Sequence, residues 1–300
     1  MEERKNSDYT EYYENIDIIG TGAFGFVYKV REKGKENDYK AVKVIKLDEL
    51  RNSIMMEIGM GNLEENLNCY IDDYIREYEI MKLCSENNAN SVKCYEYFQS
   101  EESFAIVMEL CDKNLYQILN ERRKKCNEGF KPEEIYEIMK QLNNAFKNME
   151  ENKVIHRDLK LENILVKYND KEHNNFTLKL SDYGSSRRLD SLSRNKCITG
   201  VGTLIYTAPE ILNREEYNYK VDLWSIGIII YRLRFVTSPF TGKTDVALIN
   251  NIINFKKSDL KSTGNKELDD WIKILIEKDP IKRPSWNEYF KHPFFKDKTK

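Results

Sequence analysis

The N-terminal part of the chain alternates short apolar runs with polar turns, a pattern that is typical of β-strands. Residues 16–19, 26–30 and 39–45 form three such runs, and residues 34–38 between the last two contain a glycine and several charges. Strands that are joined by short turns pair antiparallel. The pattern therefore predicts a small antiparallel sheet at the start of the chain.

A helix and two further strands follow these runs. After Asp72 the apolar residues recur at helical spacing between residues 75 and 83. Residues 91–98 and 104–110 then return to the composition of strands. The first lobe is thus predicted to be a sheet with one helix.

Beyond Cys111 the apolar residues recur mainly at helical spacing. A proline and two glutamates at residues 132–134 suit the first turn of a helix. Residues 163–166 and 177–180 flank a polar stretch and fit a hairpin. The chain is therefore expected to be an α+β protein with a mainly helical second lobe. Its other helices are expected at residues 114–124, 221–233, 243–253, 266–277 and 285–290.

Composition narrows the class of protein. The 300 residues are 40% hydrophobic and 12% aromatic, which is ordinary for a globular protein with a substantial core. The formal net charge of −2 gives no bulk attraction to nucleic acid or to an anionic membrane. Six cysteines are scattered without a C-x-x-C pair, which is typical of reduced thiols.

The ends of the chain carry no pattern of a targeting or lipid-attachment signal. The start of the chain is charged, and the most apolar run, residues 223–235, contains arginines and is too short to span a bilayer. No myristoylation or prenylation motif is present. We therefore expect a cytoplasmic protein without a membrane anchor. A nuclear location is the alternative.

The most informative segment is residues 154–163, Val-Ile-His-Arg-Asp-Leu-Lys-Leu-Glu-Asn. It places three polar side chains at the spacing that phosphoryl transfer needs. Asp158 can accept the proton of an attacking hydroxyl, Lys160 can neutralise charge on the phosphoryl group, and Asn163 can offer an oxygen to a magnesium ion. The segment predicts a catalytic loop.

Two features of the first lobe are suited to binding a nucleotide. Residues 19–27, Ile-Gly-Thr-Gly-Ala-Phe-Gly-Phe-Val, lie between two predicted strands, so their glycines allow a tight hairpin whose amides approach phosphates. A hairpin without a ligand is the alternative, whereas a dinucleotide fold is disfavoured because a strand follows the last glycine. Lys43 lies inside an apolar strand and needs an anionic partner if it is buried; otherwise it is an exposed strand lysine.

The motifs resemble those of the eukaryotic protein kinase superfamily, of the serine/threonine type. Besides the glycine loop and the catalytic loop, the chain has Asp182-Tyr183-Gly184, Ala208-Pro209-Glu210 and an arginine at position 283, all in the order of the family. The resemblance implies the two-lobed protein kinase fold over residues 13–295, with an N-lobe of residues 13–110, a C-lobe of residues 111–295, and short tails at residues 1–12 and 296–300.

The resemblance also implies a site for ATP and Mg²⁺. Asp158 would be the base, Lys160 and Asn163 would assist it, and Asn163 and Asp182 would bind the metal. Glu77 would pair with Lys43, and Met108 would line the adenine pocket just before the hinge. The nucleotide-binding residues are expected to be Ile19, Gly20, Thr21, Gly22, Ala23, Phe24, Gly25, Phe26, Val27, Ala41, Lys43, Glu77, Met108, Glu109, Cys111, Leu165 and Asp182.

Lys160 and Thr203 match residues of kinases that phosphorylate serine or threonine, so protein substrates with these acceptors are expected. Glu162 either attracts a basic residue of the substrate or is a solvated surface acid. Arg157 precedes the base, and kinases with this arginine are commonly activated by a phosphate in the activation segment. Thr199 is the first candidate for that phosphate, followed by Ser191 and Ser193.

The chain departs from the family between Lys43 and Glu77, where an insert of about residues 48–73 contains several methionines and glycines. We expect this insert to be a surface loop, with a docking site for a regulator as the alternative. Two rival functions remain. A pseudokinase would bind partners without catalysis, but the polar motifs are intact, and a small-molecule phosphotransferase would lack the Ala-Pro-Glu segment.

Overall fold

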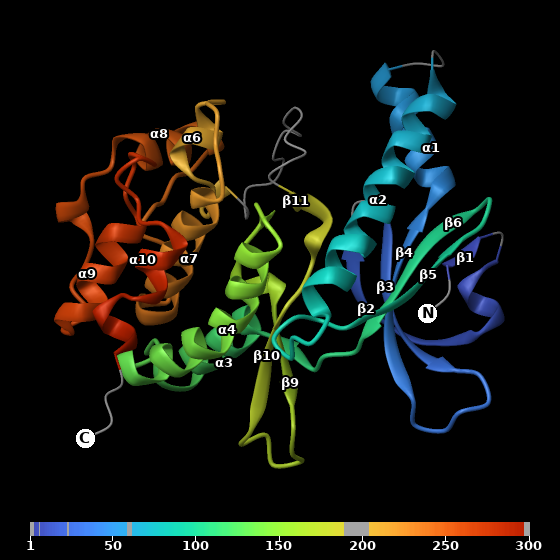
Figure 1. Cartoon of the computed structure of the whole chain (residues 1–300), viewed down its shortest axis with the longest axis horizontal. Helices are drawn as coiled ribbons and strands as arrows, with labels where there is room; N and C mark the ends of the chain where they lie inside the picture. Colours follow the sequence, from blue (N-terminus) through green and yellow to red (C-terminus); the bar gives the residue numbers. More distant parts are fainter. Residues whose placement is uncertain (1–2, 6, 23, 59–61, 189–203, 297–300) are drawn as a thin grey trace. The chain divides into compact units, whose positions relative to one another are not determined.

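The computed structural model describes residues 3–5, 7–22, 24–58, 62–188 and 204–296. The chain divides into two compact units, residues 1–112 (unit 1) and residues 113–300 (unit 2). Figure 1 shows unit 1 as a sheet with two long helices and unit 2 as a mainly helical body with a hairpin.

In the described part of the chain, the sheet of unit 1 has six strands in the order β1-β5-β6-β4-β3-β2. All neighbouring strands are antiparallel except β1, which pairs parallel with β5. The five expected strands are therefore confirmed, and β1 is an addition within the expected N-terminal tail. The strands are β1 (Glu3–Lys5), β2 (Tyr13–Gly22), β3 (Gly25–Glu32), β4 (Tyr39–Lys46), β5 (Cys94–Gln99) and β6 (Ser103–Glu109).

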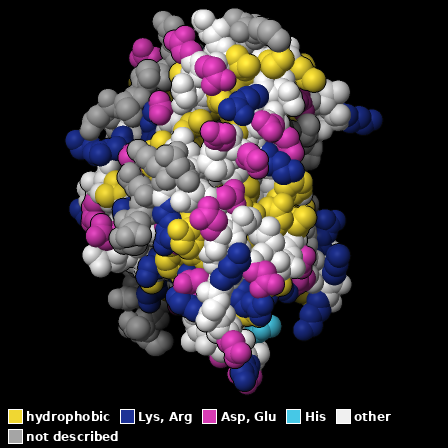
Figure 2. Space-filling model, turned by 90° about the vertical axis from the view of Figure 1, so that its right-hand side faces the viewer, with side chains coloured by type: hydrophobic (Ala, Val, Ile, Leu, Met, Phe, Trp, Pro, Cys, Tyr) yellow, Lys and Arg dark blue, Asp and Glu magenta, His cyan; other side chains and the backbone are white. Residues whose placement is uncertain are grey.

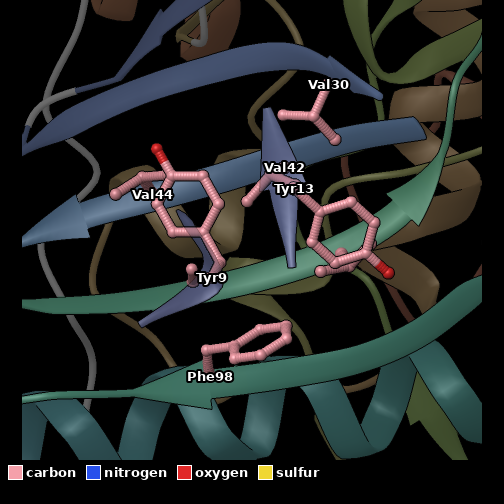
Figure 3. Close-up of a cluster of buried hydrophobic side chains, with 8 residues drawn as sticks. Tyr9, Tyr13, Val30, Val42, Val44 and Phe98 are labelled. Atoms are coloured by element: carbon pink, nitrogen blue, oxygen red, sulfur yellow. The ribbon is translucent and has the colours of Figure 1, made fainter. Parts of the chain in front are cut away.

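One face of this sheet carries a cluster of buried apolar side chains. Figure 3 shows the rings of Tyr9 and Tyr13 among side chains of β3, β4 and β5, including Val42 and Phe98. Tyr13 meets Phe98 edge-on at 6.2 Å between ring centroids. The short helix η1 (Tyr9–Glu11) that positions Tyr9 is held by a capping box at Asp8. The segment before β2 thus closes the core of the sheet.

The insert of unit 1 is helical, which corrects the expected surface loop. Helix α1 (Leu47–Ile58) follows β4 directly, and α2 (Leu63–Ser85) begins well before the expected helical residues 75–83. Leu50 is fully buried and Ile54 is 3% exposed on α1, while Leu67 is 2% exposed on α2. Leu50 and Ile54 are one helical turn apart on α1, and Leu67 lies on the neighbouring helix α2. Burial of these apolar side chains favours two packed helices over a loop.

Unit 2 is built from helices around α7, with the hairpin of β9 and β10 beside α4. The expected helices and the expected hairpin are confirmed. Helix α7 is buried on all sides over most of its length, with Leu223, Trp224 and Ile228 among its buried residues. The elements are β7 (Lys113–Asn114), α3 (Leu115–Cys126), α4 (Pro132–Glu151), β8 (Val154–Ile155), β9 (Ile164–Tyr168), β10 (Phe176–Leu180), β11 (Arg187–Arg188), α6 (Pro209–Leu212), α7 (Lys220–Phe235), α8 (Asp245–Asn254), α9 (Lys266–Leu275) and α10 (Trp286–Phe290).

The surface mixes charges of both signs. Figure 2 shows acidic and basic side chains interspersed with smaller apolar areas on the face that it displays. This agrees with the nearly balanced formal charge of −2. Within the described residues, no helix combines the length and the apolar character that crossing a membrane requires.

Candidate active site

In unit 1, Lys43 on β4 forms an ion pair with Glu77 on α2. The Nζ atom of Lys43 lies 2.6 Å from a carboxylate oxygen of Glu77, and the Glu77 side chain is only 2% exposed. Glu79, two residues further along α2, is exposed. Because positions two apart face different sides of a helix, only Glu77 can meet the lysine. Lys43, whose side chain is 28% exposed, is therefore only partly buried, and its anionic partner is Glu77.

Strand register places further predicted residues on the same face of the sheet as Lys43. Val27 pairs with Lys43 across β3 and β4, and Ala41 pairs with Met108 across β4 and β6. Since side chains two residues apart share a face of a strand, Val27, Ala41, Lys43 and Met108 all project from one side. The opposite side carries the buried cluster of Figure 3. The sheet thus carries this cluster on one face and, on the other, both the helix α2 and the residues predicted to meet a nucleotide.

The glycine loop is the hairpin between β2 and β3, in which Gly22 pairs with Gly25. A Cβ atom at Gly25 would lie 1.9 Å from the carbonyl oxygen of Val44, so no side chain fits there. Ile19 is 48% exposed, although it is apolar. Close backbone packing and an uncovered apolar side chain are features expected of a loop that receives a ligand.

In unit 2, the catalytic loop gathers three polar side chains. Lys160 Nζ donates to Asp158 Oδ2 at 2.6 Å, and Asn163 Nδ2 donates to the same oxygen at 3.2 Å and to the Asp158 carbonyl at 2.9 Å. The other oxygen, Asp158 Oδ1, is buried and has no hydrogen-bond partner among the described residues. A buried acceptor that lacks a donor is costly unless a further group binds to it. Asp158 is therefore ready to accept one more hydrogen bond.

The backbone of the catalytic loop is fixed from α7. Both carboxylate oxygens of the fully buried Asp222 accept backbone hydrogen bonds, from His156 N and Arg157 N, each at 2.8 Å. Arg157 has a φ of 66°, a left-handed conformation that a non-glycine residue adopts only under such constraint. Its guanidinium donates to Ser185 O at 2.5 Å and to Tyr217 Oη at 2.8 Å. Asp222 thus positions the loop that carries Asp158.

Asn163 and Asp182 are brought together by the hairpin of β9 and β10. The register pairs Ile164 with Leu180, so the next residues outward, Asn163 and Ser181, also meet. Ser181 donates to the Asn163 carbonyl through its backbone N at 3.0 Å and its Oγ at 2.9 Å. Asp182 follows directly, with a φ of 61°. The side-chain oxygens of Asn163 and Asp182 therefore come from adjacent points of one sheet edge.

This pair of residues fits a divalent cation. An amide oxygen and a carboxylate are hard ligands of the kind that Mg²⁺ prefers, and that ion usually keeps several waters besides one or two protein ligands. Because the Asn163 nitrogen donates to Asp158, its side-chain oxygen is the atom left to bind a cation.

Tyr183, which stands where the family has phenylalanine, is fully buried. Its ring lies 5.1 Å from that of His156, between ring centroids.

In unit 1, Cys94 is 3% exposed, and burial raises the pKa of its thiol to about 12, so this cysteine stays neutral. Leu165, Glu109 and Cys111 are partly exposed. These last three are the positions predicted around an adenine ring.

Several sequence expectations lie outside the described residues. They are Ala23 of the glycine loop, Gly59, Met60 and Gly61 of the insert, Thr203, and the candidate phosphorylation sites Ser191, Ser193 and Thr199.

The structure also adds residues that the sequence did not single out for this site. Ser181 links Asn163 to the segment that carries Asp182, and its position directly before Asp182 was the available signal. Tyr206 and Arg232 meet at the catalytic loop from distant parts of the chain, and no local pattern indicated them.

Glu210 and Arg283, two of the residues that carry the family resemblance, form an ion pair in the interior of unit 2. The guanidinium of Arg283, which is fully buried, donates to both carboxylate oxygens of Glu210, at 2.7 and 3.1 Å. It also donates to the backbone carbonyls of Lys220 and Glu277. This network ties α6 to α7 and to the segment after α9, as a structural element rather than a reactive one.

Comparison with known proteins agrees with this geometry. Serine/threonine-protein kinase atg1 of Dictyostelium discoideum is 33% identical over 91% of this chain and 38% of its own length. Serine/threonine-protein kinase ATG1c of Arabidopsis thaliana is 30% identical over 93% of this chain and 35% of its own length. Serine/threonine-protein kinase ULK3 of Xenopus laevis is 29% identical over 92% of this chain and 53% of its own length.

The chain thus spans about a third to a half of these relatives. The family profile described as the protein kinase domain matches residues 13–295, which include the glycine loop, the Lys43–Glu77 pair and the catalytic loop. A match over nearly the whole chain, together with the fold of both units, leaves one conclusion: the chain belongs to the protein kinase domain family.

Proposed function

We propose that this protein is an ATP-dependent serine/threonine protein kinase whose catalytic domain spans residues 13–295. The observation that carries the proposal is the buried oxygen of Asp158, which has no hydrogen-bond partner in the described part of the chain. Its other oxygen is bound by Lys160 and Asn163. A serine or threonine hydroxyl that donates to Asp158 Oδ1 would be oriented for attack and would lose its proton there.

Each remaining residue has a role that its contacts support. Lys43, held by Glu77, binds phosphate oxygens of ATP as a fixed cation, and the glycine loop binds the phosphates through backbone N–H groups. Lys160, beside Asp158, balances negative charge on the phosphoryl group. Asn163 and Asp182 would hold Mg²⁺, which when bound supplies positive charge opposite the phosphates. Val27, Ala41, Met108 and Leu165 supply apolar contacts for the adenine.

The acceptor class follows from Lys160 and from the relatives, which are named serine/threonine-protein kinases.

We further propose control by phosphorylation of the activation segment, sensed by Arg157. Among the described residues, the guanidinium of Arg157 contacts Ser185 O and Tyr217 Oη rather than a carboxylate, so a phosphate can compete for it. Helix α1 of the insert packs against α2, the helix that carries Glu77, and the insert is therefore a second place where a regulator could act.

The test is phosphate transfer from γ-labelled ATP to generic protein substrates. The purified protein should label serine and threonine, and Asp158→Asn should reduce the rate by at least a hundredfold while leaving ATP binding intact. Lys43→Met should also reduce the rate and, unlike Asp158→Asn, should weaken ATP binding. Labelling that persists unchanged in Asp158→Asn would remove the proposed base, and partner binding without any labelling would favour the pseudokinase.

A further inference from the structure

The hydroxyl of Tyr206 joins three parts of unit 2 at the catalytic loop. Leu161 N donates to this oxygen at 3.3 Å, and Nη1 of Arg232, on α7, also donates to it. Tyr206 Oη lies 3.4 Å from a carboxylate oxygen of Glu162. The side chain is buried, and burial raises its pKa well above the ordinary value, so the hydroxyl keeps its proton.

The direction of these hydrogen bonds is fixed by counting donors. A tyrosine hydroxyl has one proton and two lone pairs. The lone pairs of Tyr206 accept from Leu161 and Arg232, so its proton points to Glu162. Glu162, a sequence candidate for binding a basic residue of the substrate, is therefore already engaged by a donor.

The positive charge of Arg232 is not neutralised by a salt bridge within the described part of the chain. Among the described residues no carboxylate forms a salt bridge with it, and its Nε is buried without a hydrogen-bond partner. Its guanidinium carbon lies 5.4 Å from the ring of Tyr116 and 5.3 Å from the ring of Tyr206. The side chain is partly exposed. Held between two rings, it is a rigid cation with remaining capacity to bind an anion.

Arg232 lies within reach of a substrate at the catalytic base. Tyr206 is bonded to Leu161, three residues after Asp158, and three residues span at most about 11 Å. A peptide whose hydroxyl meets Asp158 has its side chains two to four positions away at distances of roughly 7–14 Å when extended. The two ranges overlap, so substrate side chains at these positions are the ones that we expect near the guanidinium.

We propose that Arg232 is a specificity-determining residue that selects acceptor peptides with an aspartate or glutamate two to four positions from the phosphorylated residue. The inference rests on the proposed kinase function and names its substrate class. It also opposes the expectation from Glu162 alone, because a basic residue there would meet the charge of Arg232.

The test is a peptide set in which one position at a time is aspartate, asparagine or lysine around a fixed serine. For the wild-type protein, kcat/KM for the best aspartate peptide should exceed that of its asparagine partner by about tenfold. Arg232→Gln should bring this ratio close to one, whereas Arg232→Lys should retain most of it. Arg234→Gln is the matched control, since Arg234, two residues along α7, donates to Thr263 O.

Fluorescence anisotropy with the same peptides separates the two proposals. Tighter binding of the aspartate peptide that is lost in Arg232→Gln supports the inference even if no peptide is phosphorylated, in which case only the kinase assignment fails. A purely structural role for Arg232 would lower the activity toward all peptides equally and leave their ratio unchanged. That result, or a wild-type preference for lysine that Glu162→Gln abolishes, would overturn the inference.

Discussion

Replacing Arg283 by methionine should destabilise unit 2 more than replacing its partner Glu210 by glutamine. Both side chains are buried, at 0% and 2% exposure. Methionine would leave the Glu210 carboxylate without its cation and would also remove the donors to the Lys220 and Glu277 carbonyls. Glutamine keeps an acceptor oxygen and leaves the carbonyl bonds of Arg283 intact.

The magnitudes follow from these contacts. Breaking a buried ion pair by removing one partner costs about 3–5 kcal/mol of unfolding free energy. For a unit of this size, each kcal/mol shifts Tm by about 2–4 °C, so Arg283→Met should lower Tm by roughly 6–20 °C. Glu210→Gln leaves the buried guanidinium without its carboxylate, but that cation keeps an acceptor oxygen and its bonds to the Lys220 and Glu277 carbonyls. We therefore expect the smaller cost of weakened charged hydrogen bonds, about 1.5–3 kcal/mol, and a shift of roughly 3–12 °C.

Tryptophan fluorescence during thermal unfolding is the appropriate assay. The protein has three tryptophans, at positions 224, 271 and 286, so the signal reports on unit 2. Trp224 is itself a reporter of the network, because the guanidinium carbon of Arg283 lies 5.4 Å from its ring. Equal Tm shifts in the two variants, or a shift below about 3 °C for Arg283→Met, would show that the network does not carry this energy.

Three further predictions test other parts of the molecule. Gly25→Ala should raise KM for ATP by about tenfold in a phosphorylation assay, because its Cβ would overlap a carbonyl oxygen of β4, and an unchanged KM would contradict this. Leu50→Ala should cost about 2–5 kcal/mol in urea unfolding if α1 is a packed helix, and a cost near zero would mean that it is not. Burial raises the pKa of Asp269, but hydrogen bonds from Ser262 and Thr263 bring it below the ordinary value. Its stabilisation is therefore present above about pH 4 and is lost as the pH falls, so the stability gap between wild type and Asp269→Asn should narrow in acid rather than stay constant.

The elements that depend on local pattern could be predicted from the sequence. The strands of unit 1 and the helices of unit 2 follow from alternating or helical spacing of apolar residues. The insert could not, because Leu50 and Ile54 have helical spacing but are set among charged residues and precede two glycines, which favoured a loop. The packing of α1 against α2 buries those side chains, and this burial favours the helix.

The site shows the same division. The spacing of Asp158, Lys160 and Asn163 within one loop was enough to predict that the three side chains lie together. The contact of Tyr206 with Arg232 was not visible in advance, because it joins residues 26 positions apart through a tertiary contact. Interactions of this kind depend on how helices pack, which a single sequence does not encode at short range.

The N-terminal segment has a practical consequence for anyone who expresses this protein. Matching to the family begins at residue 13, but β1 covers the backbone of β5, and Arg4 pairs with Glu96 at 2.9 Å and lies over the ring of Tyr12 at 3.9 Å. Starting the recombinant chain at residue 13 would uncover a strand edge and remove Tyr9 from its aromatic neighbours. Low yield or self-association of such a truncated protein would then reflect a damaged sheet, and an affinity tag is better attached at the other end of the chain.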